Sequence, residues 1–357
     1  MKAISIIFLI NILILLSNCK VEDETKSKVY FTKVISGEEI VRLYKLLGHK
    51  LEGNIALKVH SGEIGNTYHL HPDFLDPIYK ETGGTFVECN TAYSGARHET
   101  GLHKKLLLEH NWTRENRRFC LMDEDPTKDL TLEIPNGKKI KKNYVGDGIK
   151  QFDSVVVLAH FKGHGMGGFG GAIKQLSIGF GSQRGKTYQH TGGVTEDWHE
   201  MSSNRASQID FTSSMADAAS SVVNYFKNKN KGGLVYVNVM AKISTSCDCD
   251  SNPPVPKIRD LGMMISTDPV AIDQACLDYV KDNGEKEGVE QLFAQIERLE
   301  GFNTLKVAEE LGIGTRNYEL VDVTPEDSSS STKPTSSSDS SFIHFRKIAT
   351  YLFGLLL

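Results

Sequence analysis

The sequence predicts an α/β fold, with a mixed, largely parallel sheet and flanking helices arranged as one large domain or as two lobes. Strand-like and helix-like patterns alternate along the chain, and this alternation is typical of βαβ units around a parallel sheet. A largely apolar run over residues 154–159 is typical of a strand buried on both faces. Between its two apolar termini the chain holds roughly 300 residues, enough for either arrangement.

The first half of the chain is predicted to alternate between strand and helix. Its predicted strands cover residues 28–32, 54–59 and 85–89, and its predicted helices cover residues 37–47, 72–81 and 102–110. Because a helix follows each strand, we expect consecutive strands to lie parallel.

In the second half, a glycine-rich segment follows the strand at 154–159, and a helix is predicted over residues 171–180. Thr267 or Asp268 is expected to cap a later helix that Pro269 opens, because proline is favourable at the first helical position. The remaining predicted strands cover residues 233–240 and 261–265, and the remaining helices cover residues 211–227, 269–280, 289–299 and 304–311.

Residues 1–19 are predicted to be a cleaved signal peptide. A lysine precedes an apolar run over residues 4–16, which is too short and ends too abruptly for a membrane span. The alternative is a bacterial lipoprotein attached through Cys19, because the preceding residues resemble a lipobox in which Asn18 stands in place of a smaller residue.

The other end of the chain is predicted to be a stalk followed by an anchor signal. Residues 324–341 are mostly Ser, Thr, Pro, Asp and Lys, and they bury too little apolar surface to fold. Residues 342–357 form a short spacer and an apolar run about half as long as a membrane-spanning helix requires. This order indicates a glycosylphosphatidylinositol attachment signal, with Ser338, or its neighbours Ser337 and Asp339, as the lipid-bearing residue. The alternative is a loosely packed amphipathic terminus.

With both signals, we expect the protein at the cell surface, held at the plasma membrane by its lipid anchor. Asn111, in Asn111-Trp112-Thr113, is then an N-glycosylation acceptor. The chain has 41 Lys and Arg against 45 Asp and Glu, so nothing indicates a nucleic-acid partner. The expected partners are a small-molecule ligand and the membrane.

Residues 157–190 hold most of the candidate chemistry. The segment leads from the carboxyl end of a predicted strand into a helix, which is where α/β sheets bind ligands. We expect His164 to be a catalytic acid or base, because an imidazole titrates near pH 6.5, and Lys174 to be catalytic and to bind a cofactor. Glycines that allow a ligand to approach the backbone closely are expected to bind that cofactor too; they are Gly167, Gly168, Gly170 and Gly171. The alternative is a structural turn, since glycine-rich loops of this kind are common.

Cys247 and Cys249 flank an aspartate ahead of a proline-rich turn. With help from His190 or His164, they are expected to bind a divalent metal, zinc, nickel or iron. Two alternatives remain, a disulfide in an oxidising compartment or a pair of inert thiols. Apart from Cys19, the cysteines available as disulfide partners are Cys89, Cys120 and Cys276.

Three motifs, in this order, resemble the family called domain of unknown function 362. They are the glycine-rich run from Gly163 to His190, the run Ser246-Cys-Asp-Cys, and the run from Ser266 to Cys276. The resemblance covers residues 28–323. Many members of that family carry ferredoxin-type inserts, whose place here is residues 191–210. This interval contains no cysteine, and an iron–sulfur cluster needs four thiolates, so no ferredoxin-type cluster is expected.

A more distant resemblance is to the nickel-pincer lactate racemases, in which three residues have the spacing of His164, Lys174 and His190. The resemblance implies that His164 is an acid/base, that Lys174 holds the pincer cofactor covalently and that His190 ligates nickel. His103 is a poorer match to the second catalytic histidine of that family. The racemases' proline after the lysine segment is replaced here by residues 176–179.

These observations predict an exported, surface-anchored, enzyme-like protein with a metal or small-anion site and acid/base or redox chemistry on a small molecule. His160 is expected to join the site residues named above. The alternative is a catalytically inactive surface binding or antigenic protein on the same fold. Arg97 and Lys58 are expected either to bind an anionic substrate or to pair with surface carboxylates. His69 and His71 are expected to be turn residues.

Overall fold

A computed structural model describes residues 26–114 and 117–326 of the chain. The predicted signal peptide with Cys19, nearly all of the predicted stalk, and the anchor signal with Ser338 lie outside the described residues. The described residues up to Thr324 group into one compact unit. Of the two arrangements expected, the structure therefore has the single large domain.

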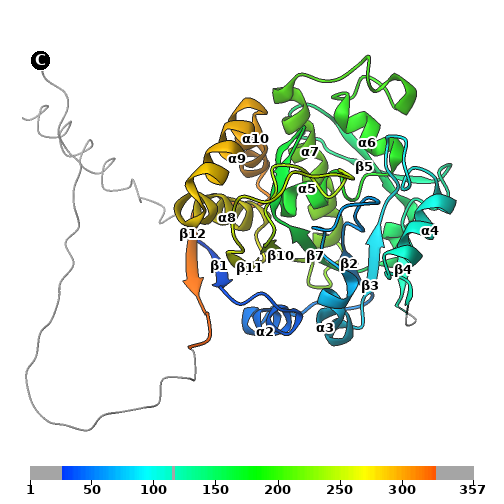
Figure 1. The fold of residues 1–357 in the computed structure, drawn as a ribbon. Coiled ribbons are helices and arrows are strands. Elements are labelled where there is room, and N and C mark those ends of the chain that lie inside the picture. Colours follow the sequence, from blue (N-terminus) through cyan, green and yellow to red (C-terminus); the bar gives the residue numbers. More distant parts are fainter. Residues whose placement is uncertain (1–25, 115–116, 327–357) are drawn as a thin grey trace, which may run out of the picture. The chain divides into compact units, whose positions relative to one another are not determined.

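An eight-stranded, largely parallel sheet runs through this domain, as the sequence predicts (Figure 1). Strand β11 is antiparallel to both of its neighbours, and the other adjacent pairs are parallel. In spatial order the strands are β12 (Tyr318–Asp322), β1 (Ser27–Thr32), β11 (Gly262–Ser266), β10 (Leu234–Met240), β7 (Ser154–His160), β2 (Ile55–Lys58), β3 (Thr85–Glu88) and β4 (Phe119–Leu121). Two short antiparallel hairpins pair β5 (Asp129–Glu133) with β6 (Lys142–Gly146), and β8 (Lys162–His164) with β9 (Gly168–Gly170).

Helices cover both faces of the sheet, with α2 and α3 on one face and α5, α7 and α8 on the other (Figure 1). Each face has its own hydrophobic core. Val155 and Val157 of β7 belong to one core, and Val156 and Leu158 belong to the other, because successive side chains of a strand point to opposite faces. The helices are α2 (Gly37–Leu47), α3 (Pro72–Thr82), α4 (Thr100–Glu109), α5 (Ala172–Leu176), α6 (Gln183–His190), α7 (Gln208–Lys227), α8 (Pro269–Asn283), α9 (Lys286–Arg298) and α10 (Gly301–Glu310). None of the described helices is long and apolar enough to span a membrane.

With one exception, the predicted helices and strands are confirmed, and no end differs by more than three residues. The predicted cap of α8 is confirmed as well. The carboxylate of Asp268 accepts hydrogen bonds from the backbone N–H groups of Val270 and Ala271, and Pro269 occupies the first turn. These local signals need no distant contact, which is why the sequence alone reveals them.

The exception is the single helix predicted over residues 171–180, which is wrong. Instead, α5 ends at Leu176 and α6 begins after Ser182. At Gly179 the chain turns so tightly that a Cβ atom would lie 2.2 Å from the carbonyl oxygen of Gln175. Ser182 then caps α6 by accepting a hydrogen bond from a backbone N–H of the first turn.

Several strands lie outside the predicted elements: β4, β5, β6, β8, β9 and β12. They are three to five residues long. Three of them, β4, β8 and β9, have only three residues and show too few alternations of polar and apolar residues to be recognised. The hairpin of β8 and β9 matters most for function, because it carries His164 at the end of β8.

Candidate functional site

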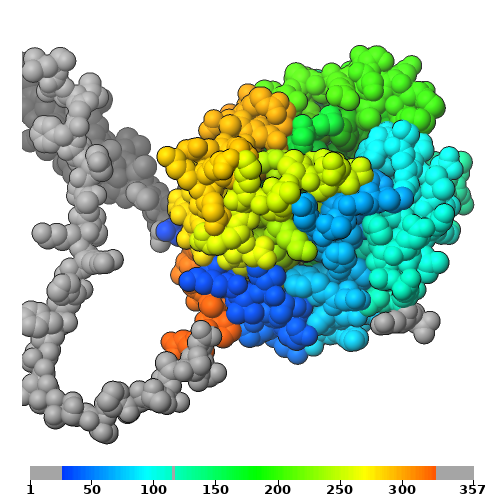
Figure 2. Space-filling model, viewed as in Figure 1, coloured from blue at the N-terminus to red at the C-terminus, as the bar shows by residue number. Residues whose placement is uncertain are grey.

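A cavity lies at the edge of the sheet where β2, β3, β7 and β10 end. These neighbouring strands are parallel, so their carboxyl ends meet at one edge. The loops that follow them border a cavity of about 360 Å³, a volume typical of small-molecule sites. Figure 2 shows the yellow-green segment after β10 lying against the blue segment after β2. A hydrogen bond of 2.9 Å from the backbone N–H of Glu63 to the carbonyl oxygen of Asp248 joins these two segments.

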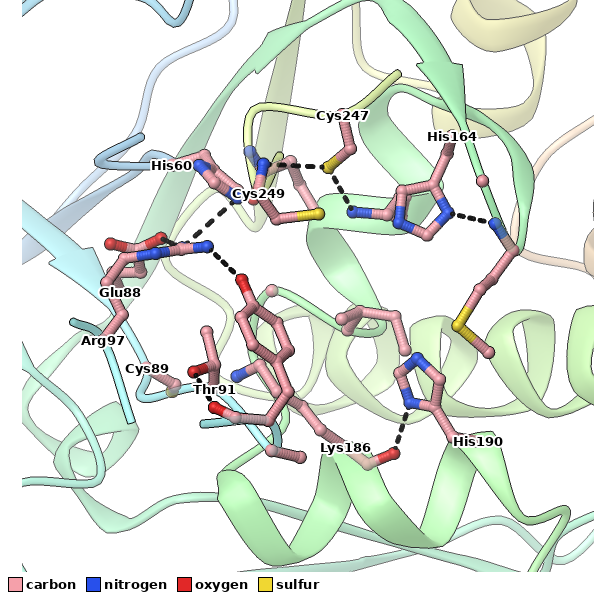
Figure 3. Close-up of a pocket in the computed structure, with 18 of the residues that line it drawn as sticks. His60, Glu88, Cys89, Thr91, Arg97, His164, Lys186, His190, Cys247 and Cys249 are labelled. Atoms are coloured by element: carbon pink, nitrogen blue, oxygen red, sulfur yellow. Dashed lines mark hydrogen bonds and ion pairs between the residues drawn. The ribbon is translucent and has the colours of Figure 1, made fainter. Parts of the chain in front are cut away.

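Asp248 holds the loop that carries the two thiols. Its buried carboxylate contacts His160 Nδ1 at 2.8 Å and accepts a hydrogen bond from Lys162 Nζ at 2.5 Å. Although burial raises the pKa of Asp248, the charges of His160 and Lys162 keep it far below its usual range. Because Asp248 turns towards these partners, Cys247 and Cys249 on either side of it face the cavity (Figure 3). His160, expected in the site, supports this loop from outside the cavity lining.

Cys247, Cys249 and His164 form a cluster on one side of the cavity (Figure 3). Each offers one ligand atom, and these atoms all lie within 4.8 Å of one another. Cys247 Sγ also accepts hydrogen bonds from the backbone N–H of Cys249 at 3.4 Å and from Lys174 Nζ at 3.8 Å. The hydrogen bond from the Cys249 thiol, the charge of Lys174 and a hydrogen bond from His164 hold the pKa of Cys247 well below its ordinary value.

The ring of His164 is oriented by the backbone of its own hairpin. Its Nδ1 accepts hydrogen bonds from the N–H groups of Gly167 at 2.8 Å and Met166 at 3.3 Å. Nδ1 therefore carries the lone pair, and Nε2 carries the proton that is directed at Cys247. Burial, with the charge of Lys174, lowers the pKa of His164.

His190 lies on the opposite side of the cavity (Figure 3). Its Nδ1 donates a hydrogen bond of 2.7 Å to the carbonyl oxygen of Lys186, and its ring stacks on Phe211 at 4.7 Å between centroids. Burial lowers the pKa of His190 to about 4, so the ring is neutral at pH 7 and Nε2 carries the lone pair. The structure thus brings His164 next to Cys247 and Cys249, whereas the sequence left open whether His164 or His190 would help those thiols.

Arg97 crosses another wall of the cavity and is 2% exposed. It donates hydrogen bonds to Glu88 at 3.1 Å, to Glu63 at 3.3 Å and to the hydroxyl of Tyr93 at 2.6 Å. Although burial raises the pKa of Glu88, a hydrogen bond from His103 and the charge of Arg97 hold it well below its usual value. Of the two alternatives for Arg97, pairing with carboxylates is therefore the one observed, in the interior rather than at the surface.

The glycines expected to bind a cofactor contact protein atoms. A Cβ on Gly171 would lie 2.3 Å from a carboxylate oxygen of Asp273, and one on Gly168 would lie 3.0 Å from the backbone of Gly301. Gly168 also has a φ of +79°, a conformation that favours glycine. Gly167 lies beside Met215 and Gly170 beside Lys174. In the structure Gly168 and Gly171 allow the hairpin and α5 to pack closely, whereas a Cβ on Gly170 would make only ordinary contacts.

Several cavity-lining residues were missed by the sequence analysis: His60, Glu88, Tyr93 and Gln175. His60 follows β2 and Glu88 ends β3, so the carboxyl ends of these two parallel strands were a signal that could have identified both. His60 contacts Arg97 Nη1 at 3.3 Å. Burial, with the charge of Arg97, lowers the pKa of His60 to about 4.

The remaining histidines of interest lie outside the cavity lining. His103 is fully buried behind Glu88, at 3.2 Å from its carboxylate, and also contacts Asn90. His69 is tilted against His71 and stacked on His110, with ring centroids 4.4 Å and 5.0 Å away. These four rings therefore belong to the packing around the loops after β2 and β3.

The described cysteines are all free thiols: Cys89, Cys120, Cys247, Cys249 and Cys276. Cys276 is buried, and its thiol contacts Met264 Sδ at 3.6 Å. Asn111 lies in a turn after α4 with a φ of 65°, and its side-chain oxygen is buried without a hydrogen-bond partner. The next residue, Trp112, is fully buried.

Residues 55–278 match the family model described as Domain of unknown function (DUF362). A comparison with curated proteins finds no match. Among solved structures, the chain is similar to the lactate racemase apoprotein from Thermoanaerobacterium thermosaccharolyticum, with 15% identity and a TM-score of 0.34 over 60% of this chain and 50% of that one. It is also similar to a protein from Thermotoga maritima, with 12% identity and a TM-score of 0.36 over 77% of this chain and 58% of that one. The chain thus spans only 50% and 58% of the lengths of these two proteins.

Proposed function

Since this chain belongs to the DUF362 family, whose model matches residues 55–278, we propose that it is an enzyme-like protein that binds a divalent metal at Cys247 and Cys249 and acts on a small molecule in the adjacent cavity. One observation carries the proposal: a nitrogen ligand and two sulfur ligands lie within 4.8 Å of one another at the wall of that cavity. Thiolate and imidazole ligands favour zinc, nickel or iron over magnesium or calcium.

The two cysteine thiols are suitable ligands for such a metal. Cys247 and Cys249 face the cavity from one short loop, and Asp248 between them fixes that loop to His160 and Lys162. Either of two imidazoles, that of His164 or that of His190, could be the third ligand. His164 is the nearer, but its Nδ1 accepts backbone hydrogen bonds, so its Nε2 would have to exchange its proton for the metal. His190 already presents the lone pair of Nε2, although it lies across the cavity.

The protein's own groups supply proton transfer and orientation beside such a site. When bound, the metal would polarise a substrate oxygen as a Lewis acid. His164 holds a proton at Nε2 against Cys247, and His190, neutral at pH 7, accepts one at Nε2. Lys174 Nζ, 3.8 Å from Cys247 Sγ, holds a positive charge against the thiolate. The three residues that resemble racemase positions thus share one cavity.

Metal analysis tests the proposal. We expect near-stoichiometric zinc, nickel or iron in anaerobically purified protein, and a loss of most of it in Cys247→Ser, because one of the two thiolates is removed. Elemental analysis of both proteins gives the result. The control is Cys276→Ser, which removes a buried thiol whose contacts are with Met264 and Asn238, and which should retain the metal.

Two further variants identify the third ligand. Loss of metal in His164→Gln but not in His190→Gln would assign His164, and the reverse result would assign His190. Full metal content in Cys247→Ser would overturn the proposed site. Wild-type protein without metal would favour a surface binding or antigenic protein on the same fold.

We also propose that the protein is exported and held at the cell surface by a glycosylphosphatidylinositol anchor at Ser338, with Asn111 glycosylated. The support comes from the sequence, which combines a short apolar N-terminal run, a Ser-rich stalk and a short apolar C-terminal run. In the Asn111 sequon Trp112 is buried and Thr113 is exposed, so modification of Asn111 would require access from the exposed side of the turn.

Phosphatidylinositol-specific phospholipase C is expected to release the protein from intact cells, because it cleaves the lipid from such anchors. Immunoblotting of cells and medium measures the release, with a known anchored protein as the control. Retention on the cells under conditions that release the control, together with lipid on Cys19, would instead establish the lipoprotein alternative.

A further inference from the structure

We propose that the cavity binds a small organic carboxylate, held between the ammonium groups of Lys58 and Lys186. This inference deepens the proposed function by naming the class of its substrate, and it rests on that function only in taking the cavity as the reaction site. It depends on the lysines, not on the sulfur atoms. Metal binding and carboxylate binding are therefore separately testable.

The two lysines are buried cations with no carboxylate within ion-pair distance among the described residues, although Lys186 is near enough to the buried Asp123 for its charge to oppose the rise in pKa that burial causes there. Lys58 is 1% exposed and Lys186 is 7% exposed, and both line the cavity. Lys58 Nζ donates hydrogen bonds to the carbonyl oxygen of Val59 and to Gln175 Oε1 at 2.9 Å, whereas Lys186 Nζ donates to the carbonyl oxygen of Gly181. Within the described part of the chain, neither forms an ion pair with a carboxylate. Buried lysines are normally paired.

The other charges of the cavity do not neutralise these lysines. Glu88 is the one carboxylate among the described lining residues, and it is already engaged by Arg97 and by His103. Lys174 adds a third lysine to the lining. Burial, together with the charges of Lys186 and Lys174, lowers the pKa of Lys58 to about 8, despite the opposing effect of Glu88. At pH 7 the cavity therefore holds an excess of positive charge that an anion would relieve.

The geometry favours a carboxylate over a phosphate. Phosphates are typically held by the free N–H groups at a helix N-terminus. At this edge of the sheet carboxylates of the protein already accept hydrogen bonds from several of those groups. Asp273 accepts the N–H groups of Ala172 and Ile173 at the start of α5, and Asp123 accepts that of Gln183 at the start of α6. What remains is the ammonium groups of Lys58 and Lys186, which act as point charges, and that of Lys174, which also donates to Cys247.

The rest of the lining suits a short organic body. Apolar side chains also border the cavity, among them Ala92, Met166, Ile178 and Met201. Lys174 is close enough to both Lys58 and Cys247 for its charge to influence the pKa of each. A carboxylate between Lys58 and Lys186 would therefore direct the remainder of the molecule past Lys174 towards Cys247 and His164.

Calorimetric titration with propionate, glycolate, succinate and inorganic phosphate tests the inference. We expect at least one of the carboxylates to bind the full-length protein, and to bind Lys58→Met and Lys186→Met at least tenfold more weakly. The matched control is Lys231→Met, which removes an exposed lysine in the turn before β10 and should leave affinity unchanged. Circular dichroism checks the folding of each variant, and Lys58→Gln replaces Lys58→Met if the latter misfolds.

The outcomes separate this inference from the metal proposal. Carboxylate binding that needs Lys58 but survives Cys247→Ser supports the lysine site, whatever the metal content. No binding of any carboxylate, equal binding to Lys58→Met, or tighter binding of phosphate than of every carboxylate would overturn it. In each of these three cases, loss of the metal from Cys247→Ser would still support the metal site at Cys247 and Cys249.

Discussion

Arg97→Met is expected to lower the free energy of unfolding by about 3–5 kcal/mol. Arg97 is buried and donates to the buried carboxylates of Glu88 and Glu63 at 3.1 Å and 3.3 Å. Removing one partner of a buried ion pair leaves the other charge without compensation, and this loss has the stated size. Glu88 would retain His103 as a partner, whereas Glu63 has no other cation within ion-pair distance among the described residues.

Urea denaturation at pH 7 measures this change. Arg205→Met is the matched control, because Arg205 borders the same cavity but is exposed and forms no ion pair in the described structure. It should change the free energy by no more than about 0.5 kcal/mol. A loss below about 1 kcal/mol in Arg97→Met would mean that the two carboxylates are solvated or protonated in the folded protein. Arg97 would then be available to a substrate.

Lys58→Met is expected to act in the opposite direction and to stabilise the protein at pH 7. Burial lowers the pKa of Lys58 from 10.5 to about 8, and a change of this size corresponds to about 3 kcal/mol, since each pKa unit is about 1.4 kcal/mol. Methionine removes this cost, but it leaves the carbonyl oxygen of Val59 and Oε1 of Gln175 without their hydrogen bonds from Lys58. Each lost hydrogen bond offsets about 1 kcal/mol of the gain. The net gain is therefore about 1 kcal/mol.

The effect depends on pH with a definite sign. In the unfolded chain Lys58 binds its proton more tightly than in the folded protein, so the cost is present in full below pH 8 and disappears as the pH rises towards 10.5. The free energy of unfolding of Lys58→Met, measured relative to wild type, should thus fall by about 3 kcal/mol between pH 7 and pH 10.5. At the upper end of this range Lys58→Met should therefore be less stable than wild type.

Denaturation curves at several pH values between 7 and 10.5 follow this crossover, with Lys231→Met as the control for general alkaline effects. A stability difference that does not change with pH would show that Lys58 is uncharged or fully solvated in the folded protein. An added carboxylate that binds the cavity should reverse the order at pH 7, because it stabilises only the protein that retains Lys58.

Two cations on the walls of one cavity therefore have opposite expected effects on stability. Arg97 is compensated by carboxylates of the protein itself, so its removal costs stability. Lys58 is not, so its presence costs stability at pH 7. Groups that destabilise the folded state are commonly retained for function, which makes Lys58 the better candidate for contact with a substrate.

The sequence by itself determined the order of the main helices and strands and the class of the fold. Hydrophobic periodicity, the cap at Asp268 and the proline that follows it act between near neighbours in the chain, so they can be recognised without a structure. It also located two of the segments that border the cavity, the one after β7 and the one after β10. The division of the helix predicted over residues 171–180 escaped it, because the turn at Gly179 depends on a close contact with Gln175.

Only the tertiary structure decided which side chains meet in the cavity. His160 and His164 lie four positions apart, yet one supports Asp248 and the other faces Cys247. Lys58 and Arg97 offered the same two alternatives in the sequence, and the structure separates them by placing Glu88 and Glu63 beside Arg97 alone. Such contacts join loops that are far apart in the chain, and their partners are set by how parallel strands bring those loops to one edge of the sheet.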